Sequence, residues 1–507
     1  MRLLSLVDSP LAAIQVRAKS IPVAAAVALV ALLASLTYLV DIGHPGYPVW
    51  DESYYLTTTI RYEEGIAQFA SHPPLALMLI AAGDELLQVN RGVDTTIIGV
   101  DKKVAGEQIP KQFSFAGVRV ASGVFAVAGA VAFFALMLAL TGSVIASVFL
   151  ANLYVFENAY IVHFRAAHLD GFQIFFTLCM LLCFVACIKR GTRSSALLDF
   201  TLGLACGLAS MVKVNAIVLA ALGVMIVAWR ARMSWNEQPA WKVATRAVRD
   251  GGLMVAGGLL AIFAVFSLHV LVGQRPPDIN TPAGQKDIKF VSAPYLEYLQ
   301  GKRPFSPAVV IAATEGYSRF MHDDFTGITH VDSNASWPMQ WPLHEKTINY
   351  RWDAVNGITR YVQLCGNQFS WALALLAPLA ALSLLILQKL HPCAAKDPHR
   401  RTILVMLLLQ YVVFMAVHAW LGTQRVMYLY HYFIGLLLAF CLVPLVWMEA
   451  ADRWRGLQTR LVPVMAGATV LLLASFAFYA PLTYHLPLSH AECERRNALQ
   501  QIVDCVK

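Results

Sequence analysis

The sequence predicts an all-α, polytopic membrane protein with about eleven transmembrane helices and two large external loops. Apolar residues make up 58% of the 507 residues and charged residues only 14%, and the mean hydropathy is +0.58. A soluble globular chain carries about 25% charged residues, so this apolar excess needs a bilayer to cover it. A helix that crosses the hydrocarbon core needs about 20 mostly apolar residues, and eleven segments approach or exceed that length.

The predicted spans follow one another without an internal repeat or a low-complexity tract. The first has too long an apolar run for a signal-peptide core and no clear small-x-small cleavage site, so we expect a retained span. Three of the others are short, which leaves ten or twelve spans as alternatives. In chain order the spans lie near 21–40, 116–140, 143–157, 168–188, 196–211, 214–229, 251–273, 369–388, 402–421, 427–447 and 461–480.

Loop charges predict the orientation. Positively charged short loops stay cytoplasmic, and the turns after the fourth, sixth, eighth and tenth spans are basic. The loop from Asp41 to Phe113 instead holds ten acidic and five basic residues, which favours the external side. The net charge of +8 follows from this topology, and no nucleic-acid surface is predicted. The basic residues of the four turns are Lys189, Arg190, Arg193; Arg230, Arg232, Lys242, Arg246, Arg249; Lys389, Lys396, Arg400, Arg401; Arg453, Arg455 and Arg460.

This topology divides the chain into five parts. Residues 1–20 are a cytoplasmic N-terminus, 21–273 an N-terminal transmembrane module with the external loop 41–113, and 274–368 a large external loop. Residues 369–480 form a C-terminal transmembrane module, and 481–507 an external tail. Long loops on a rigid helical scaffold are where binding and catalysis concentrate, so the two loops are expected to carry the function.

The first loop begins with an acidic pair among aromatic residues, Trp50-Asp-Glu-Ser-Tyr54. In an extended segment successive side chains alternate, so one carboxylate would face a reacting group while the other braces the loop. A carboxylate desolvated by aromatic neighbours would have a raised pKa, which suits a general base. The alternative is a solvated acidic pair flanked by interfacial aromatic rings.

A second group of ionisable residues lies between the third and fourth spans. Five of the fourteen residues from Glu157 to Asp170 are ionisable, and a charge within a membrane costs roughly 2.5–3.5 kcal/mol on translocon scales. On a helix Arg165 and His168 would share a face. Arg119 and Lys213 add positive charge at nearby spans. The alternative is that these side chains snorkel or fix the topology.

The remaining candidates lie in the loops and at the start of the tenth span. His72 stands in a Ser-His-Pro-Pro-Leu segment before an apolar run too short to span, which we expect to lie in the membrane interface. The large loop is rich in tryptophan and proline, which are typical both of sugar or lipid sites and of interfacial anchors. Its His322, Asp323 and His330 could bind a divalent cation.

These motifs together resemble the protein O-mannosyltransferase family. The resemblance follows chain order from about residue 20 to 450, and its motifs are Trp50 to Tyr54, His72 to Leu75, Arg119 with Ser122, Asn158 to Asp170, Gly207 to Lys213, Ser336 to Leu343, Gly366-Asn367 and Arg425 to Tyr432. It implies a membrane protein with the GT-C fold, surrounded by membrane lipid, and an enzyme that needs no cofactor. Such an enzyme moves mannose, with inversion, from a polyprenyl or dolichyl phosphate to Ser/Thr hydroxyls of exported polypeptides.

The resemblance also implies roles for individual residues. Asp51 would be the base, and Glu52 would orient the loop or the acceptor. A lipid phosphate leaving group needs positive charge, and Arg165, Lys213 and Arg425 are the candidates. The supporting residues are His72, Arg119, His168, Asp170, Trp341, Asn367, Tyr430 and His431.

Two departures from the family pattern bear on the acceptor. Ala76-Leu77 follows His-Pro-Pro-Leu where the family usually has Gly-Lys, and the large loop of about 95 residues is too short for a MIR domain. The chain is therefore similar to the compact bacterial members, which implies a bacterial inner membrane with the site facing the periplasm, or the endoplasmic reticulum if the source is eukaryotic. Alternatives are a lipid-phosphate transferase acting on a glycolipid or polysaccharide, a transporter, and a non-catalytic chaperone.

The cysteines give a separate expectation. Of nine, Cys493 and Cys505 lie in the predicted external tail, where disulfides persist. The two form either a disulfide or a pair of free thiols.

Overall fold

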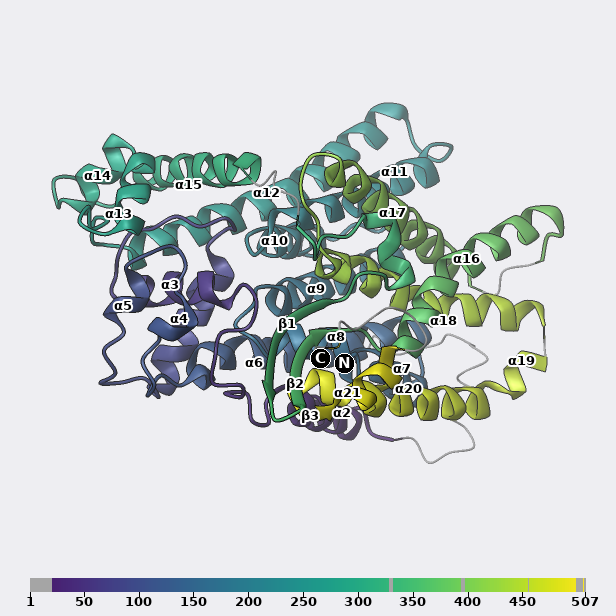
Figure 1. The fold of residues 1–507 in the computed structure, drawn as a ribbon. Helices are drawn as coiled ribbons and strands as arrows, with labels where there is room; N and C mark the ends of the chain where they lie inside the picture. Colours follow the sequence, from purple (N-terminus) through teal and green to yellow (C-terminus); the bar gives the residue numbers. More distant parts are fainter. Residues whose placement is uncertain (1–20, 328–331, 394–396, 455, 498–504, 506–507) are drawn as a thin grey trace.

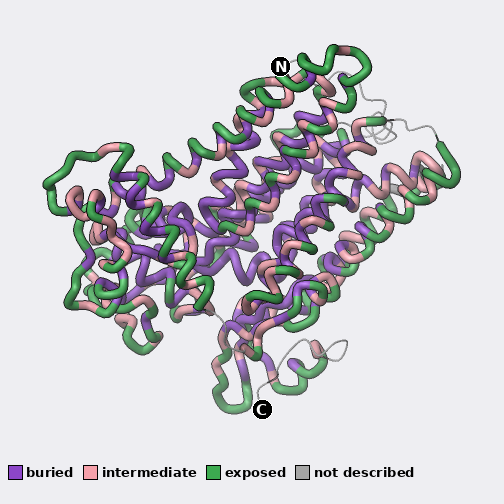
Figure 2. Tube along the Cα trace, turned by 90° about the horizontal axis from the view of Figure 1, so that it is seen from above, coloured by how far each residue is buried: buried purple, intermediate pink, exposed green. Residues whose placement is uncertain are grey.

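The fold is a bundle of long helices with a layer of shorter helices and one small sheet (Figure 1). We describe it from a computed structural model, which covers residues 21–327, 332–393, 397–454, 456–497 and 505. Buried residues follow the inner faces of the long helices, and exposed residues follow their outer faces and the connecting turns (Figure 2). The predicted cytoplasmic segment 1–20 lies outside the described residues.

Every predicted span coincides with a helix. In the described part of the chain, eight helices are long and apolar enough to cross a membrane, α7 and α8 form a bent pair, and α2 and α10 are shorter apolar helices. The total of eleven spans stays a prediction. The bounds are α2 (Val23–Tyr38), α6 (Phe115–Thr141), α7 (Val144–Val155), α8 (Asn158–Phe164), α9 (Asp170–Lys189), α10 (Ala196–Ser210), η2 (Val214–Leu219) with α11 (Ala220–Ser234), α12 (Ala240–Val272), α16 (Gln368–Leu390), α17 (Pro398–Gly422), η5 (Leu429–Tyr432) with α18 (Phe433–Arg453), α19 (Gly456–Thr459) and α20 (Leu461–Thr483).

Local sequence signals set several helix ends. The side chains of Ser143, Asn367 and Asp397 accept hydrogen bonds from backbone N–H groups in the first turns of α7, α16 and α17. These caps satisfy donors that a helix start leaves unpaired. Gly142 ends α6 with a φ of 69°, the left-handed conformation that favours glycine.

The third predicted span is followed by a bend. The span 143–157 corresponds to α7, and the helix axis turns by 60° between α7 and the short helix α8 that follows it. Glu157 lies at this bend, and its fully buried side chain caps α8 by accepting from the Ala159 N–H at 3.2 Å. The same carboxylate accepts from the Asn367 N–H at 2.9 Å and from Trp371 Nε1 at 3.0 Å. Glu157 therefore joins the α7–α8 break to the start of α16.

The first external loop is a folded layer of short helices. These are α3 (Glu52–Glu63), α4 (Leu75–Leu87), α5 (Thr96–Gly99) and η1 (Gly106–Gln108). The extended conformation expected around Glu52 is wrong, because α3 begins there. The apolar run expected in the membrane interface is α4, which packs against α6 so closely that a Cβ at Gly83 would lie 2.9 Å from the Ala121 Cβ.

The large loop contains helices and then a hairpin. Its elements are α13 (Pro282–Asp287), η3 (Ile288–Phe290), α14 (Ala293–Leu299), α15 (Pro307–Gly327), η4 (Pro338–Leu343), β1 (Ile348–Val355) and β2 (Ile358–Leu364). The turn between the strands is Asn356-Gly357, with φ of 50° and 76°, the conformation of a tight hairpin. The sheet is an exception to the all-α expectation.

The C-terminal tail completes that sheet. Its strand β3 (Pro487–Ser489) pairs antiparallel with β2, and α21 (His490–Asn497) follows. Cys493 and Cys505 form a disulfide, which decides between the two expectations for these cysteines. Buried Cys493 packs with Tyr361 of β2. The tail is thus part of one unit with the large loop.

Both external loops and the tail lie at the same end of the bundle. Ile66 of the first loop forms a parallel bridge with Arg275 at the start of the large loop. His44 Nε2 lies 3.1 Å from Nδ1 of His485 in the tail. This arrangement agrees with the loop-charge argument, while the side of the membrane that they face stays a prediction.

The tail disulfide gives a direct test of that side. We expect a membrane-impermeant maleimide added to intact cells to label Cys493 only after reduction, because the predicted topology places the tail outside and the disulfide occupies its thiols. The exposed Cys393, in the turn between α16 and α17 at the other end, serves as the control. It should react only once the membrane is opened. Labelling of Cys493 without reduction would contradict the disulfide, and labelling only after opening would contradict the topology.

Candidate active site

Asp51 stands where the first external loop turns into α3. Trp50, directly before it, has a φ of 52°, a conformation that a bulky side chain rarely adopts without support from its surroundings. The half-buried Asp51 carboxylate lies 3.5 Å from the hydroxyl of Tyr430. Asp51 therefore faces the start of α18, a segment almost 380 residues away in the sequence.

The surroundings of Asp51 raise its pKa to about 6. Burial is the largest cause, and the nearby Asp170 carboxylate acts in the same direction. Lys213, Lys103 and the hydrogen bond from Tyr430 oppose it by favouring the ionised form. A carboxylate with such a pKa is ionised near neutral pH and yet basic enough to accept a proton.

Glu52 points away from Asp51, because consecutive residues of a helix diverge by about 100°. Its fully buried carboxylate accepts two hydrogen bonds of 2.7 Å from Arg119 Nε and Nη2 on α6. It also accepts from the Val49 N–H at 2.7 Å and the Ala167 N–H at 2.6 Å. Glu52 thus has four donors and no free side toward a substrate.

The remaining N–H donors of Arg119 bond to the backbone segment that precedes Asp51. Its guanidinium donates to the carbonyl oxygens of Pro45 and Tyr47, each at 2.8 Å. The Glu52–Arg119 pair therefore fixes three segments at once, namely the entry to the first loop, the start of α3 and the backbone after α8.

A chain of polar contacts lies next to Asp51. Lys213, between α10 and η2, places Nζ 2.6 Å from Asp170 Oδ2 at the start of α9. His163 Nε2 lies 2.7 Å from the same oxygen, and the Tyr350 hydroxyl lies 2.7 Å from His163 Nδ1. Lys213 Nζ is also 5.1 Å from the centroid of the Tyr430 ring, a cation–π distance. These contacts thus end at Tyr430, the hydrogen-bond partner of Asp51.

The other cations and histidines border this group. The pKa of His72 is lowered to about 3, by burial first and also by the charges of Lys213 and Arg425. His168 Nε2 lies 3.0 Å from the Val49 carbonyl oxygen. The guanidinium of half-buried Arg425 lies over the Phe325 ring at 4.8 Å. Arg425 is therefore a second positive charge beside the site.

Aromatic rings enclose the group. Trp50 stacks on Tyr350 with centroids 5.2 Å apart, and Tyr428 stacks on Tyr430 at 5.6 Å. Tyr430 also stacks on His431 at 4.6 Å. Tyr350 was not predicted from the sequence, because a single tyrosine in a long loop carries no spacing signal, and Tyr428 was covered only by the Arg425 to Tyr432 motif.

Three predicted residues lie outside this group. Arg165 donates to the carbonyl oxygens of Val40 and Asp41, at 2.7 and 2.9 Å. It thus pairs carbonyl groups just beyond the C-terminal end of α2. Asn367 caps α16 and donates to the Leu472 carbonyl oxygen at 3.0 Å. Buried Trp341 bonds to Ser336 Oγ at 2.9 Å. Its contact with the site is indirect, through the His431 ring at 6.2 Å.

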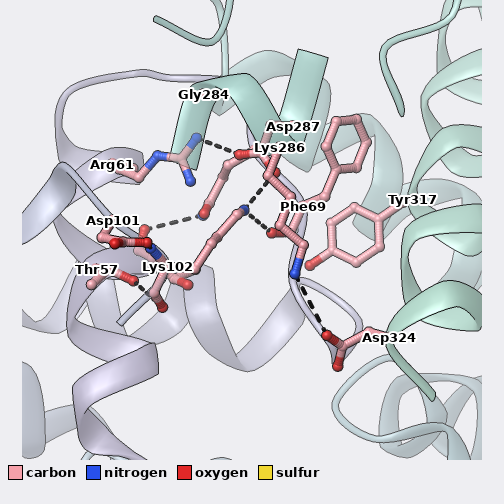
Figure 3. A network of polar contacts seen from close by, with 12 residues as sticks. Thr57, Arg61, Phe69, Asp101, Lys102, Gly284, Lys286, Asp287, Tyr317 and Asp324 are labelled. Carbon is pink, nitrogen blue, oxygen red and sulfur yellow. Dashed lines mark hydrogen bonds and ion pairs between the residues drawn. The ribbon is translucent and has the colours of Figure 1, made fainter. Parts of the chain in front are cut away.

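A second buried ion cluster joins the two external loops (Figure 3). Asp287 of α13 forms ion pairs with Arg61 of α3 and with Lys102. Lys102 also donates to the Phe69 carbonyl oxygen at 2.6 Å, and burial lowers its pKa to about 8. Thr57 of α3 donates to the Lys102 carbonyl oxygen at 3.1 Å. This cluster holds α3, whose N-cap residue is Asp51, against the large loop.

The candidate cation ligands do not form a site in the described part of the chain. His322 and Asp323 line an open groove of about 550 Å³ on α15. His330 lies outside the described residues. Among residues 21–327, 332–393, 397–454, 456–497 and 505, no three His, Cys, Asp or Glu side chains are grouped to hold a metal ion.

Comparison with known proteins places the chain in a family. Residues 28–272 match the family described as dolichyl-phosphate-mannose-protein mannosyltransferase, and residues 318–502 match the C-terminal four-transmembrane region of protein-O-mannosyltransferase. The chain belongs to the protein O-mannosyltransferase family. It is a multi-pass membrane glycosyltransferase.

A solved structure supports the fold. The chain is similar to the S. cerevisiae protein O-mannosyltransferase Pmt1-Pmt2 complex bound to the sugar donor, with a TM-score of 0.74 and 14% identity over 97% of this chain and 94% of that one. ArnT from Cupriavidus metallidurans in the apo state aligns with a TM-score of 0.32 and 12% identity over 83% and 77% of the two chains. Curated protein sequences give no significant match. The expected GT-C fold is confirmed by the first of these structures.

Proposed function

We propose that this enzyme transfers mannose from a polyprenyl or dolichyl phosphate to Ser or Thr hydroxyls of exported polypeptides. The observation that carries the proposal is the position of Asp51. In a chain of this family, it is a half-buried carboxylate with a pKa of about 6, placed beside Tyr430 and next to the Lys213–Asp170 pair.

Asp51 is the general base in this proposal. The acceptor hydroxyl gives its proton to Asp51 as its oxygen bonds to the anomeric carbon, and the bond from that carbon to the phosphate oxygen breaks. Attack from the face opposite the leaving phosphate inverts the anomeric configuration. The raised pKa keeps Asp51 ionised at neutral pH and gives it more affinity for the proton than a solvated aspartate has.

Lys213 and Arg425 bind the phosphate in this proposal. Negative charge increases on the phosphate as the bond to the sugar breaks, and a cation held in a site of low polarity stabilises that charge more than it would in water. Lys213 is fixed by Asp170 and by the Tyr430 ring. Arg165, a candidate from sequence, is assigned instead to the backbone after α2.

Replacement of Asp51 by Asn tests the base. We expect Asp51→Asn to lower transfer at least 100-fold, because general-base catalysis contributes about 10²–10⁴-fold and Asn cannot accept the proton. In the wild type the rate should fall as pH drops through about 6, since protonated Asp51 is inactive. The assay incubates membranes with labelled polyprenyl-phosphate mannose and follows label into extracted protein and lipid.

The exposed Glu107 in the same loop offers the control, and Glu107→Gln should transfer at the wild-type rate. Wild-type turnover by Asp51→Asn would remove Asp51 from the mechanism. Label found only in the lipid fraction would contradict a polypeptide acceptor and favour a glycolipid one.

A pair of replacements tests the donor site. Lys213→Met is expected to weaken binding of polyprenyl phosphate to the purified protein at least tenfold, because it removes the charge that faces the phosphate. Arg165→Met should lower the melting temperature and leave the affinity of the folded protein unchanged. If Arg165→Met melts like the wild type and binds the lipid phosphate poorly, Arg165 belongs to the donor site. Normal binding by Lys213→Met would mean that Lys213 only neutralises Asp170.

A further inference from the structure

We propose that Tyr350 of the large loop is a positioning residue for the transfer reaction. It acts through His163 and Asp170 on Lys213, and the external sheet that includes the C-terminal tail holds it in place. The inference rests on the proposed function, since it gives Tyr350 a part in the use of the lipid-phosphate donor.

The hydrogen-bond pattern assigns a direction to the chain of contacts. The Asp170 carboxylate is ionised by its Lys213 partner and only accepts hydrogen bonds, so His163 Nε2, 2.7 Å away, carries the proton. In a neutral imidazole Nδ1 is then an acceptor, and the Tyr350 hydroxyl 2.7 Å away is its donor. Tyr350 therefore fixes both the tautomer and the ring orientation of His163.

Asp170 connects His163 to the charge that acts on the donor. Its Oδ2 accepts hydrogen bonds from both His163 Nε2 and Lys213 Nζ. A rotated His163 would leave Asp170 with one partner fewer and would allow Lys213 to shift. Tyr350 thus sets the position of Lys213 without touching it, in the way that outer partners orient the groups of an active site.

Tyr350 owes its position to an irregularity in the sheet. In the β1–β2 register Asn349 faces Gln363 and Arg351 faces Val362, so Tyr350 has no cross-strand partner. Such a bulge redirects the side chain of the extra residue, and bulges are frequent beside active sites. Tyr350 is 7% exposed, and its ring is held against Trp50, the residue before Asp51.

The tail supports the strand that carries Tyr350. Its β3 pairs with β2, the neighbour of β1. His485 at the start of the tail places Nε2 2.8 Å from Asp353 Oδ2 on β1 itself. Asp353 also pairs with Arg351, directly after Tyr350, at 2.6 Å. The large loop and the tail therefore both support the position of the bulge.

The test replaces only the hydroxyl. Tyr350→Phe keeps the ring against Trp50 and should lower kcat/KM for polyprenyl-phosphate mannose about tenfold, the scale of one buried hydrogen bond. The KM for the acceptor peptide should stay unchanged. Tyr361→Phe is the matched control, because it removes the hydroxyl of a buried tyrosine on β2 that packs with Leu488 and Cys493. It should keep wild-type kinetics.

A double-mutant cycle separates positioning from a structural effect. If Tyr350 acts through His163, adding Tyr350→Phe to His163→Gln should cause no further loss, since the partner of the hydroxyl is already gone. Losses that multiply in the double variant would overturn the proposal. So would a Tyr350→Phe enzyme with wild-type kinetics, or one whose loss is matched by Tyr361→Phe.

The experiment also distinguishes failure of the proposed function. If the wild type transfers no sugar from any labelled polyprenyl phosphate, the proposed function is wrong. The role of Tyr350 is then read from the binding of unglycosylated polyprenyl phosphate to the purified full chain. Weaker binding by Tyr350→Phe than by Tyr361→Phe would support it, and equal binding would overturn it.

Discussion

The buried ion pair between Glu52 and Arg119 is the interaction on which the site depends. Arg119 lies inside a helix that crosses the membrane, where an unpaired cation would be costly. Removing one partner of a buried pair typically costs about 3–5 kcal/mol, because the other charge stays buried alone. The pair also orders the backbone of residues 42–49 and the Ala167 N–H. Since Asp51 is adjacent to Glu52, its position follows from this arrangement.

The two neighbouring carboxylates differ because their partners differ. Glu52 is paired with a guanidinium and two backbone N–H groups, so it is committed to structure. Asp51 has one long hydrogen bond from Tyr430 and a half-buried setting that raises its pKa. Environments that give adjacent carboxyl groups separate tasks are a common feature of active sites. The bend of the chain at Glu157 and the Asp287 cluster act further out, by holding α8 and α3 in place.

The sequence predicted what depends on local patterns and on motif order. In the part of the chain that the structure describes, apolar length located each helix that is long and apolar enough to cross a membrane. Loop charge placed both loops and the tail at one end, and the motifs indicated the family. It did not predict what depends on tertiary contacts. Arg165 lies among the other cations in sequence, but its partners are carbonyl groups after α2. Tyr350 reaches the site through a bulge, and β3 pairs with a strand more than 120 residues earlier, so neither leaves a local signal.

The most direct test of this account is a double-mutant cycle on the free energy of unfolding, with Glu52→Gln and Arg119→Gln measured singly and together in detergent. We expect each single replacement to cost about 3–5 kcal/mol, and the double to cost little more than either one, because no unpaired charge remains. Costs that add in the double variant, or a Glu52→Gln protein as stable as the wild type, would contradict the central role of this pair.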